Sequence, residues 1–248
     1  MKIIRQILGC VLILPVSASY IFAQTLTDST FVARAEQHIS EIYAGQLNSG
    51  ARIYNGKMYR PLLNLDNGGH TLFQSNQYSR GSIVYEGRIY KDLNLMYDLF
   101  RDQLVLLNYD KVGGIIIWPQ YVDSFSIHQH KFIHIKPDSS PHTGFPPGYY
   151  DLIYDGKTRL LAKRTKTISE TADEYKVKKN ISEKSKYYIL KDSAYTQVKS
   201  KKDLLKLLHR TQNENQNYIK KEHLDFKKNF EDSMVRLLSH HDSIPPNL

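Results

Sequence analysis

The stretch Gly81–Asp110, GSIVYEGRIYKDLNLMYDLFRDQLVLLNYD, decides the fold class of this chain. It alternates short runs of β-branched, aromatic and aliphatic residues with brief polar joints, which is typical of consecutive β-strands. Glu86-Gly87 lies between two such runs, and glycine adopts the positive φ of a type I′ turn without steric cost. We therefore expect a two-residue hairpin that places Tyr85 opposite Arg88.

The same turn signal occurs twice more, at Asn55-Gly56 and at Asp155-Gly156. Both dipeptides lie between apolar residues, so each predicts another hairpin. The intervals between the three glycines are unequal, which excludes a solenoid or propeller with a fixed repeat. Three hairpins that serve only the fold are the main interpretation, and three similar ligand-presenting edges are the alternative.

Short apolar runs continue on both sides of this stretch. The joints between them are only a few residues long, which forces neighbouring strands to be antiparallel. Ile115–Trp118 is apolar at every position and predicts a central strand. Between Leu160 and Val177 the strand signal fades into polar residues. The runs are Leu93–Leu99, Gln103–Asn108, Gly114–Trp118, Val122–Ile127, Lys131–Ile135, Lys186–Leu190 and Ala194–Val198.

Helical spacing appears only near the two ends of the chain. Apolar residues recur every three or four positions in Thr27–Tyr43, in Ser200–Arg210 and again from Asp225 to His240. The expected fold is therefore mainly β (α+β), with an antiparallel β-meander at residues 51–198. This meander would form an open sheet, a partial barrel or a sandwich. A short N-terminal helical segment at 24–50 and a C-terminal helical pair at 199–248 would accompany it.

The first 23 residues have the organisation of a secretory signal peptide. Lys2 and Arg5 precede an apolar run that ends in Ala23, where we expect cleavage. Cys10 is the single cysteine of the chain, and most of the apolar run follows it, so we expect no lipidation there. The mature chain would then hold no thiol, no disulfide and no transmembrane segment.

The chain carries a formal net charge of +9, and its C-terminal half is the more basic. Residues 156–228 contain 20 Lys and Arg against 9 Asp and Glu. No RNP motif, helix-turn-helix signature or zinc finger accompanies these cations. We therefore interpret them as a solvated basic face and expect no binding of nucleic acid.

Motifs for nucleophilic serine, nucleotide-phosphate, zinc-protease and calcium chemistry are all missing from the sequence. His128, His130 and His134 come nearest to a metal site, because on one continuous strand they would share a face. A turn at His128–Lys131 would instead scatter them. We therefore predict that the protein binds neither a metal nor a cofactor. These three histidines are the candidate ligands if a metal is bound.

Asp98 and Asp102 flank a joint between two expected strands. Placed on a cleft, they could serve as a general acid and a general base. The simpler expectation is that Asp102 accepts hydrogen bonds from the backbone of the turn while Asp98 pairs with Arg101 or another basic residue. No catalytic residue is assigned from the sequence.

Three stretches carry a family resemblance. They are Phe22-Ala23-Gln24, YEGRIYKDLNLMYDLFRDQLVLL at Tyr85–Leu107, and YYILKDSAYTQVKSKKDLLKLL at Tyr187–Leu208. Together they resemble a group of uncharacterised secreted β-rich proteins of the Bacteroidetes. The resemblance implies an exported protein in the periplasm or on the surface of a Gram-negative bacterium, and it implies no activity.

The function expected from these observations is that of a non-enzymatic envelope protein that binds a ligand or a protein partner. The first alternative is a carrier that holds a lipid or another apolar molecule in a half-open barrel. The second is a hydrolase whose site is assembled from dispersed residues such as Asp98, Asp102, His128 and His130. The identity of the partner and the oligomeric state are left open.

Overall fold

The structure is a computed structural model that describes residues 52–62, 65–66, 69–137, 145–173, 176–191 and 194–244. All of them belong to one compact unit, Asn48–Leu248. The predicted signal peptide, Cys10 and the predicted helical segment at 24–50 therefore lie outside the described residues.

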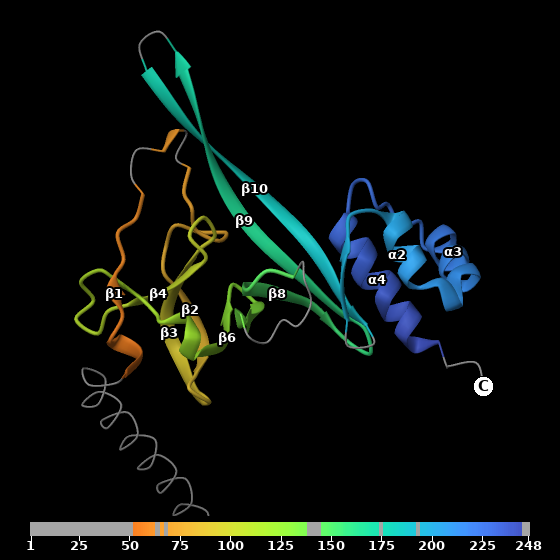
Figure 1. Ribbon diagram of the computed structural model, residues 1–248, viewed down its shortest axis with the longest axis horizontal. Helices are drawn as coiled ribbons and strands as arrows, with labels where there is room; N and C mark the ends of the chain where they lie inside the picture. The colour runs from red at the N-terminus through yellow and green to blue at the C-terminus, as the bar shows by residue number, and fades with distance from the viewer. Residues whose placement is uncertain are drawn as a thin grey trace, which may run out of the picture. The chain divides into compact units, whose positions relative to one another are not determined.

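The described residues form a mainly β structure in which eleven strands make one open sheet (Figure 1). Every pairing is antiparallel, and the order in the sheet is β1-β5-β4-β3-β2-β6-β7-β8-β9-β10-β11. The strands are β1 (Lys57–Met58), β2 (Ser79–Tyr85), β3 (Arg88–Asp98), β4 (Gln103–Leu107), β5 (Gly114–Ile116), β6 (Val122–Ile127), β7 (His130–Ile135), β8 (Gly148–Asp155), β9 (Arg159–Asp173), β10 (Lys176–Lys191) and β11 (Ala194–Val198). The expectation of an antiparallel, mainly β fold is confirmed, and the open sheet is the form it takes.

The hairpin predicted at Glu86-Gly87 joins β2 to β3. Both turn residues have positive φ, 50° and 71°, and Tyr85 pairs with Arg88 as expected. The side of the hairpin that carries Ile83 and Tyr85 is buried, because it faces the interior of the curved sheet. The opposite side is open to solvent.

The Asn55-Gly56 hairpin prediction is wrong. A 3₁₀ turn, η1 (Arg52–Tyr54), precedes this dipeptide, and β1 pairs with β5, which is remote in the sequence. A side chain at Gly56 would collide with the backbone carbonyl of Ile116, so this glycine permits close approach of two strands. Its role is in packing rather than in a turn.

The Asp155-Gly156 signal does mark a hairpin, but the loop is longer than predicted. Asp155 pairs with Arg159 across a three-residue loop, residues 156–158. The carboxylate of Asp242, far along the chain, accepts hydrogen bonds from the amide of Thr158 at 2.9 Å and from its hydroxyl at 3.0 Å. A tertiary contact thus accompanies the longer loop.

The strands from β5 to β6 curve around a buried core. β5 and β6 stand four places apart in the sheet. Only residues 117–121 join these two strands along the chain, and this link includes the 3₁₀ turn η3 (Pro119–Tyr121). In a flat sheet this separation would be about 19 Å, more than a link with a 3₁₀ turn spans. The prediction of a central strand at Ile115–Trp118 is wrong, since β5 has only the two-residue β1 beyond it. Aromatic rings fill the curve, with Phe125 and Phe132 stacked at 4.8 Å.

The longest strands, β9 and β10, form a two-stranded ribbon that continues well beyond their neighbours (Figure 1). The pairing of β9 with β10 is continuous. It begins where Arg159 lies opposite Leu190 and ends where Asp173 lies opposite Lys176. The fading strand signal at Leu160–Val177 therefore misled the prediction, because the strands continue through this polar stretch. The side chains there are polar because both faces of the ribbon meet solvent, and a ribbon of this kind lacks the apolar alternation of a half-buried strand.

Three α-helices are present in the C-terminal part that the structure describes: α2 (Lys201–Leu207), α3 (Gln212–Lys221) and α4 (Phe230–Ser243), with the 3₁₀ turn η5 (His209–Thr211) after α2. The sequence predicted only a pair. Helix α3 was missed because Tyr218 and Ile219 are its only large apolar residues. Apolar side chains of the helices pack with Leu160, Ile189 and Val198 of the sheet. Within the described ranges, none of the helices has the length and hydropathy needed to cross a membrane.

Candidate ligand pocket

Asp98 organises the turn between β3 and β4. Its Oδ1 accepts hydrogen bonds from the amides of Phe100 at 3.0 Å and Arg101 at 3.1 Å, and its Oδ2 accepts one from the Tyr59 hydroxyl at 2.9 Å. Asp98 also pairs with Arg101 at 3.5 Å, as predicted. The carboxylate is fully buried and occupied by these contacts.

Asp102 has a different role from the one predicted, because Asp98 and not Asp102 accepts the amides of the turn. One Asp102 oxygen lies 2.6 Å from Nζ of Lys163, and the other accepts a hydrogen bond of 2.5 Å from the Tyr97 hydroxyl. The two aspartates are thus committed to separate partners. Asp98 fixes the turn itself and its contact with Tyr59, while Asp102 joins the turn to Lys163 of β9, so both roles are structural.

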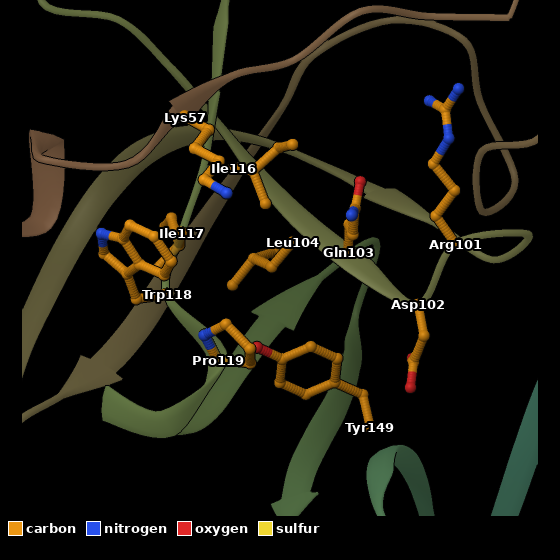
Figure 2. A pocket seen from close by; sticks show the side chains of 10 residues that line it. All are labelled: Lys57, Arg101, Asp102, Gln103, Leu104, Ile116, Ile117, Trp118, Pro119 and Tyr149. Carbon is orange, nitrogen blue, oxygen red and sulfur yellow. The ribbon is translucent and has the colours of Figure 1, made fainter.

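Asp102 also borders a pocket of about 280 Å³ (Figure 2). The pocket is built by strands β1, β4 and β8, the end of β5 and the turn before β4. Its walls are mostly apolar, and its polar groups come from only a few side chains. The lining residues are Lys57, Arg101, Asp102, Gln103, Leu104, Ile116, Ile117, Trp118, Pro119 and Tyr149.

Two buried polar atoms in the pocket lining have no hydrogen-bond partner among the described residues: Oε1 of Gln103 and the hydroxyl of Tyr149. Figure 2 shows the Tyr149 hydroxyl directed toward Pro119. Burial raises the pKa of Tyr149 far above that of a free phenol, so this group stays a neutral hydroxyl. An unsatisfied buried polar group costs about 1–3 kcal/mol, so these two atoms require a hydrogen-bond partner from within the pocket, either water or a polar group of a ligand.

Lys57 supplies the uncommitted positive charge of the pocket. Its side chain is exposed, it forms no ion pair within the described part of the chain, and its Nζ lies 5.6 Å from the centre of the Trp118 ring. Figure 2 shows its ammonium directed from β1 into the pocket. Arg101 is engaged elsewhere, since it donates to the carbonyl of Arg60 at 2.8 Å. A ligand would therefore meet one free cation, at Lys57.

The predicted turn separates His128 from His130 and His134, which both lie on β7. His128 and Gln129 both have positive φ, 50° and 65°, and β7 begins immediately after them. Nε2 of His128 lies 3.1 Å from the Ser79 hydroxyl, while Nδ1 of His134 lies 3.1 Å from the Val122 carbonyl. No group of three metal-ligating side chains occurs in the ranges that the structure describes.

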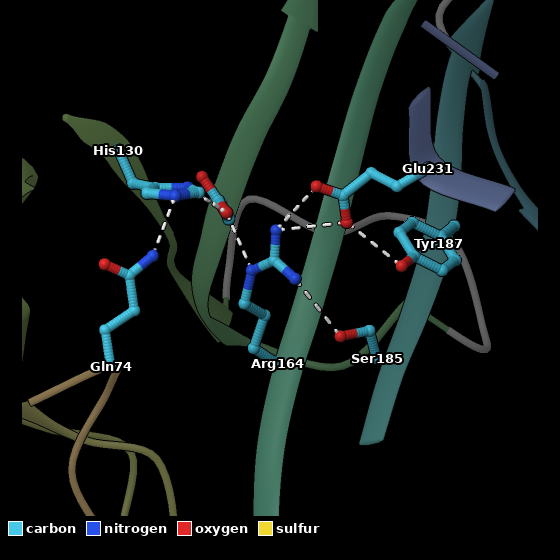
Figure 3. A network of polar contacts seen from close by, with 7 residues as sticks. Gln74, His130, Arg164, Ser185, Tyr187 and Glu231 are labelled. Carbon is cyan, nitrogen blue, oxygen red and sulfur yellow. Dashed lines mark hydrogen bonds and ion pairs between the residues drawn. The ribbon is translucent and has the colours of Figure 1, made fainter. Parts of the chain in front are cut away.

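His130 belongs to a polar network that joins the sheet to α4 (Figure 3). Its Nδ1 lies 2.7 Å from Oδ2 of Asp151. The same oxygen accepts a 2.7 Å hydrogen bond from Nε of Arg164. The guanidinium of Arg164 also donates hydrogen bonds of 3.0 and 3.1 Å to the two carboxylate oxygens of Glu231. The remaining members are Gln74, Ser185 and Tyr187. His130 contacts an amide rather than a hydroxyl at Nε2, so the network contains no Ser-His-Asp arrangement and serves to hold α4 on the sheet.

The sequence did not identify the residues of the pocket. Lys57, Gln103, Trp118 and Tyr149 lie on four segments and share no motif or spacing. Trp118, the single tryptophan of the chain, was the one conspicuous residue among them. Only the pairing of strands brings these side chains together.

Comparison of the chain with models of protein families, with curated proteins and with solved structures found no match. The functional argument therefore depends on the geometry of the pocket.

Proposed function

We propose that this protein is a non-enzymatic binding protein of the Gram-negative envelope and that it holds a small amphipathic anion in the pocket beside Trp118. One observation carries the proposal. The buried, unpartnered polar atoms of Gln103 and Tyr149 lie in the same largely apolar pocket as the unpaired ammonium of Lys57. Pockets for small molecules combine apolar walls with a few converging polar groups in this way.

Each part of the pocket suits a different part of such a ligand. A carboxylate beside Lys57 would gain a charge-assisted hydrogen bond at the open end. An aliphatic or aromatic body would contact Leu104, Ile117 and Trp118. The volume of about 280 Å³ lies at the lower end for small-molecule pockets. A small monocarboxylic acid therefore fits better than a membrane lipid, which argues against the apolar carrier.

Export is supported by the sequence of the first 23 residues and by the resemblance to secreted Bacteroidetes proteins. A protein that captures a small anion outside the inner membrane needs no catalytic group of its own. The committed hydrogen bonds of Asp98, Asp102 and His130 favour binding over a hydrolase with a dispersed site.

The single tryptophan allows a direct test. We would titrate the protein with octanoate and phenylacetate, each paired with its methyl ester, and record Trp118 fluorescence. We expect a saturable change with at least one acid and weaker binding of its ester. Lys57→Gln should weaken binding of the acid roughly fivefold and leave the ester unaffected, because a hydrogen bond to a charged group contributes on the order of 1 kcal/mol or more.

Lys91→Gln is the matched control, since Lys91 is equally exposed but lies outside the pocket. It should bind both acids as the unchanged protein does. Absence of a saturable change with all four probes up to millimolar concentration would count against this ligand class. Native mass spectrometry of gently purified protein would then report whether any other molecule is bound.

A further inference from the structure

A second feature, independent of the pocket, lies on the helical part of the protein. Five exposed lysines surround two hollows formed by α2, α3 and the loop after α3. Two exposed histidines border the same hollows, His209 in the first and His223 in the second. We call this surface the basic helical face and define it by Lys201, Lys202, Lys206, Lys220 and Lys227.

The acidic residues nearby do not neutralise these lysines. Asp203 accepts hydrogen bonds from the Lys199 amide and the Ser200 hydroxyl, where it caps α2. Glu222 pairs with Arg236 at 2.8 Å. Asp225, which lines the second hollow, accepts two backbone amides, and these hydrogen bonds together with the charge of Lys227 lower its pKa, so this carboxylate stays ionised and offsets one of the positive charges. None of the five lysines forms an ion pair within the part of the chain that the structure describes, so the face keeps a net positive charge after Asp225 is counted.

Apolar side chains line the hollows between the lysines. Leu205 lies in the first hollow, and Ile219, Leu224 and Phe226 lie in the second. Lys201 borders both hollows, and its Nζ is 5.8 Å from the centre of the Phe226 ring. The surface thus offers cations beside apolar side chains, of which Ile219 is buried and the other three are half-buried, rather than a uniformly polar field.

We propose that the basic helical face docks on an anionic phospholipid surface. Lipid phosphates complement the unpaired lysines, and the apolar groups between them suit the boundary between headgroups and acyl chains. Nucleic acid fits less well, because sequence-tolerant binding of single strands uses exposed aromatic faces. Phe226 is the one Phe, Tyr or Trp among the residues that line these hollows, and it is half-buried beside Lys201. Besides the imidazoles of His209 and His223, these lining residues therefore offer no exposed ring for base stacking.

The test is sedimentation of the protein with vesicles of phosphatidylcholine, alone or with 30% phosphatidylglycerol. We expect binding only to the anionic vesicles, and we expect it to weaken as salt is raised from about 0.05 to 0.5 M. Replacing all five lysines by glutamine should abolish measurable binding. Each lysine near an anionic surface contributes roughly a fivefold factor in partitioning.

A second variant separates the position of the lysines from their total charge. It replaces five exposed lysines elsewhere by glutamine, which lowers the net charge equally, and should retain most of the binding. These control positions are Lys91, Lys111, Lys131, Lys184 and Lys186.

Three outcomes would overturn the proposal: equal sedimentation with neutral vesicles, equal losses in the two variants, or no binding to vesicles while a 20-base DNA oligonucleotide binds. The last result would assign the face to nucleic acid. Circular dichroism of both variants establishes that each is folded.

Discussion

Replacement of Arg164 by methionine tests the reasoning about the network that joins the sheet to α4. Arg164 is mostly buried and contacts Asp151 and Glu231. Asp151 is 1% exposed, and its Oδ1 already has no hydrogen-bond partner among the described residues. The substitution would leave this buried carboxylate without its guanidinium. Breaking a buried ion pair costs about 3–5 kcal/mol, and because His130 stays 2.7 Å from Asp151 we expect the lower end of this range.

Urea unfolding, followed by far-ultraviolet circular dichroism, measures the effect. For a loss of about 3 kcal/mol we expect the midpoint to fall by roughly 1–2 M urea. Arg159→Met is the matched control, because Arg159 forms an ion pair of the same length, 2.7 Å, with Asp155 on the surface. An exposed pair contributes about 0–1 kcal/mol, so the control should unfold close to the unchanged protein.

A double variant separates the lost pair from lost packing. Replacing both Arg164 by methionine and Asp151 by leucine removes the charge together with its partner, and such apolar replacement is often neutral. We expect it to recover much of the stability lost in Arg164→Met. The reasoning is refuted if Arg164→Met unfolds at the same urea concentration as Arg159→Met, because the buried pair would then contribute no more than the exposed one.

Two further predictions concern pH and the ribbon. Burial lowers the pKa of His70, His134 and His241 below the ordinary value of 6.5, so the unfolded chain binds protons more readily and stability should fall as pH drops below about 6.5. The free energy of unfolding should fall by less than about 1.4 kcal/mol per pH unit for each histidine, since water screens these partly exposed rings. Urea midpoints measured from pH 7.5 down to pH 5 test this prediction. Midpoints that stay constant or rise as the pH is lowered would contradict it. Replacing the outer ribbon, Glu170–Lys179, by Asn-Gly should change the free energy of unfolding by only about 1 kcal/mol, because its described side chains are mostly exposed, although the hydrogen bond from the Lys179 amide to Asp66 is lost. A loss above about 3 kcal/mol in urea unfolding would instead make the outer ribbon part of the cooperative core.

The strands between Gly81 and Ile135 could be predicted because their signals are local. Alternating apolar residues and short polar joints predicted most of β2 to β7 to within a few residues. Positive φ at Glu86 and Gly87 follows from the turn chemistry of that dipeptide alone. The apolar stripes near the C-terminus likewise located α2 and α4.

The sequence by itself therefore determined most strands between Gly81 and Ile135, their antiparallel direction and the two apolar helices, because hydrophobic period and turn chemistry act over a few residues. The tertiary structure decided what depends on distant partners. Asn55-Gly56 became a close contact with β5 instead of a turn, and the polar ribbon of β9 and β10 formed without an apolar face. The pocket around Trp118 has the same origin. Its lining residues are far apart in the sequence, and only the curvature and strand order of the sheet place them within reach of one ligand.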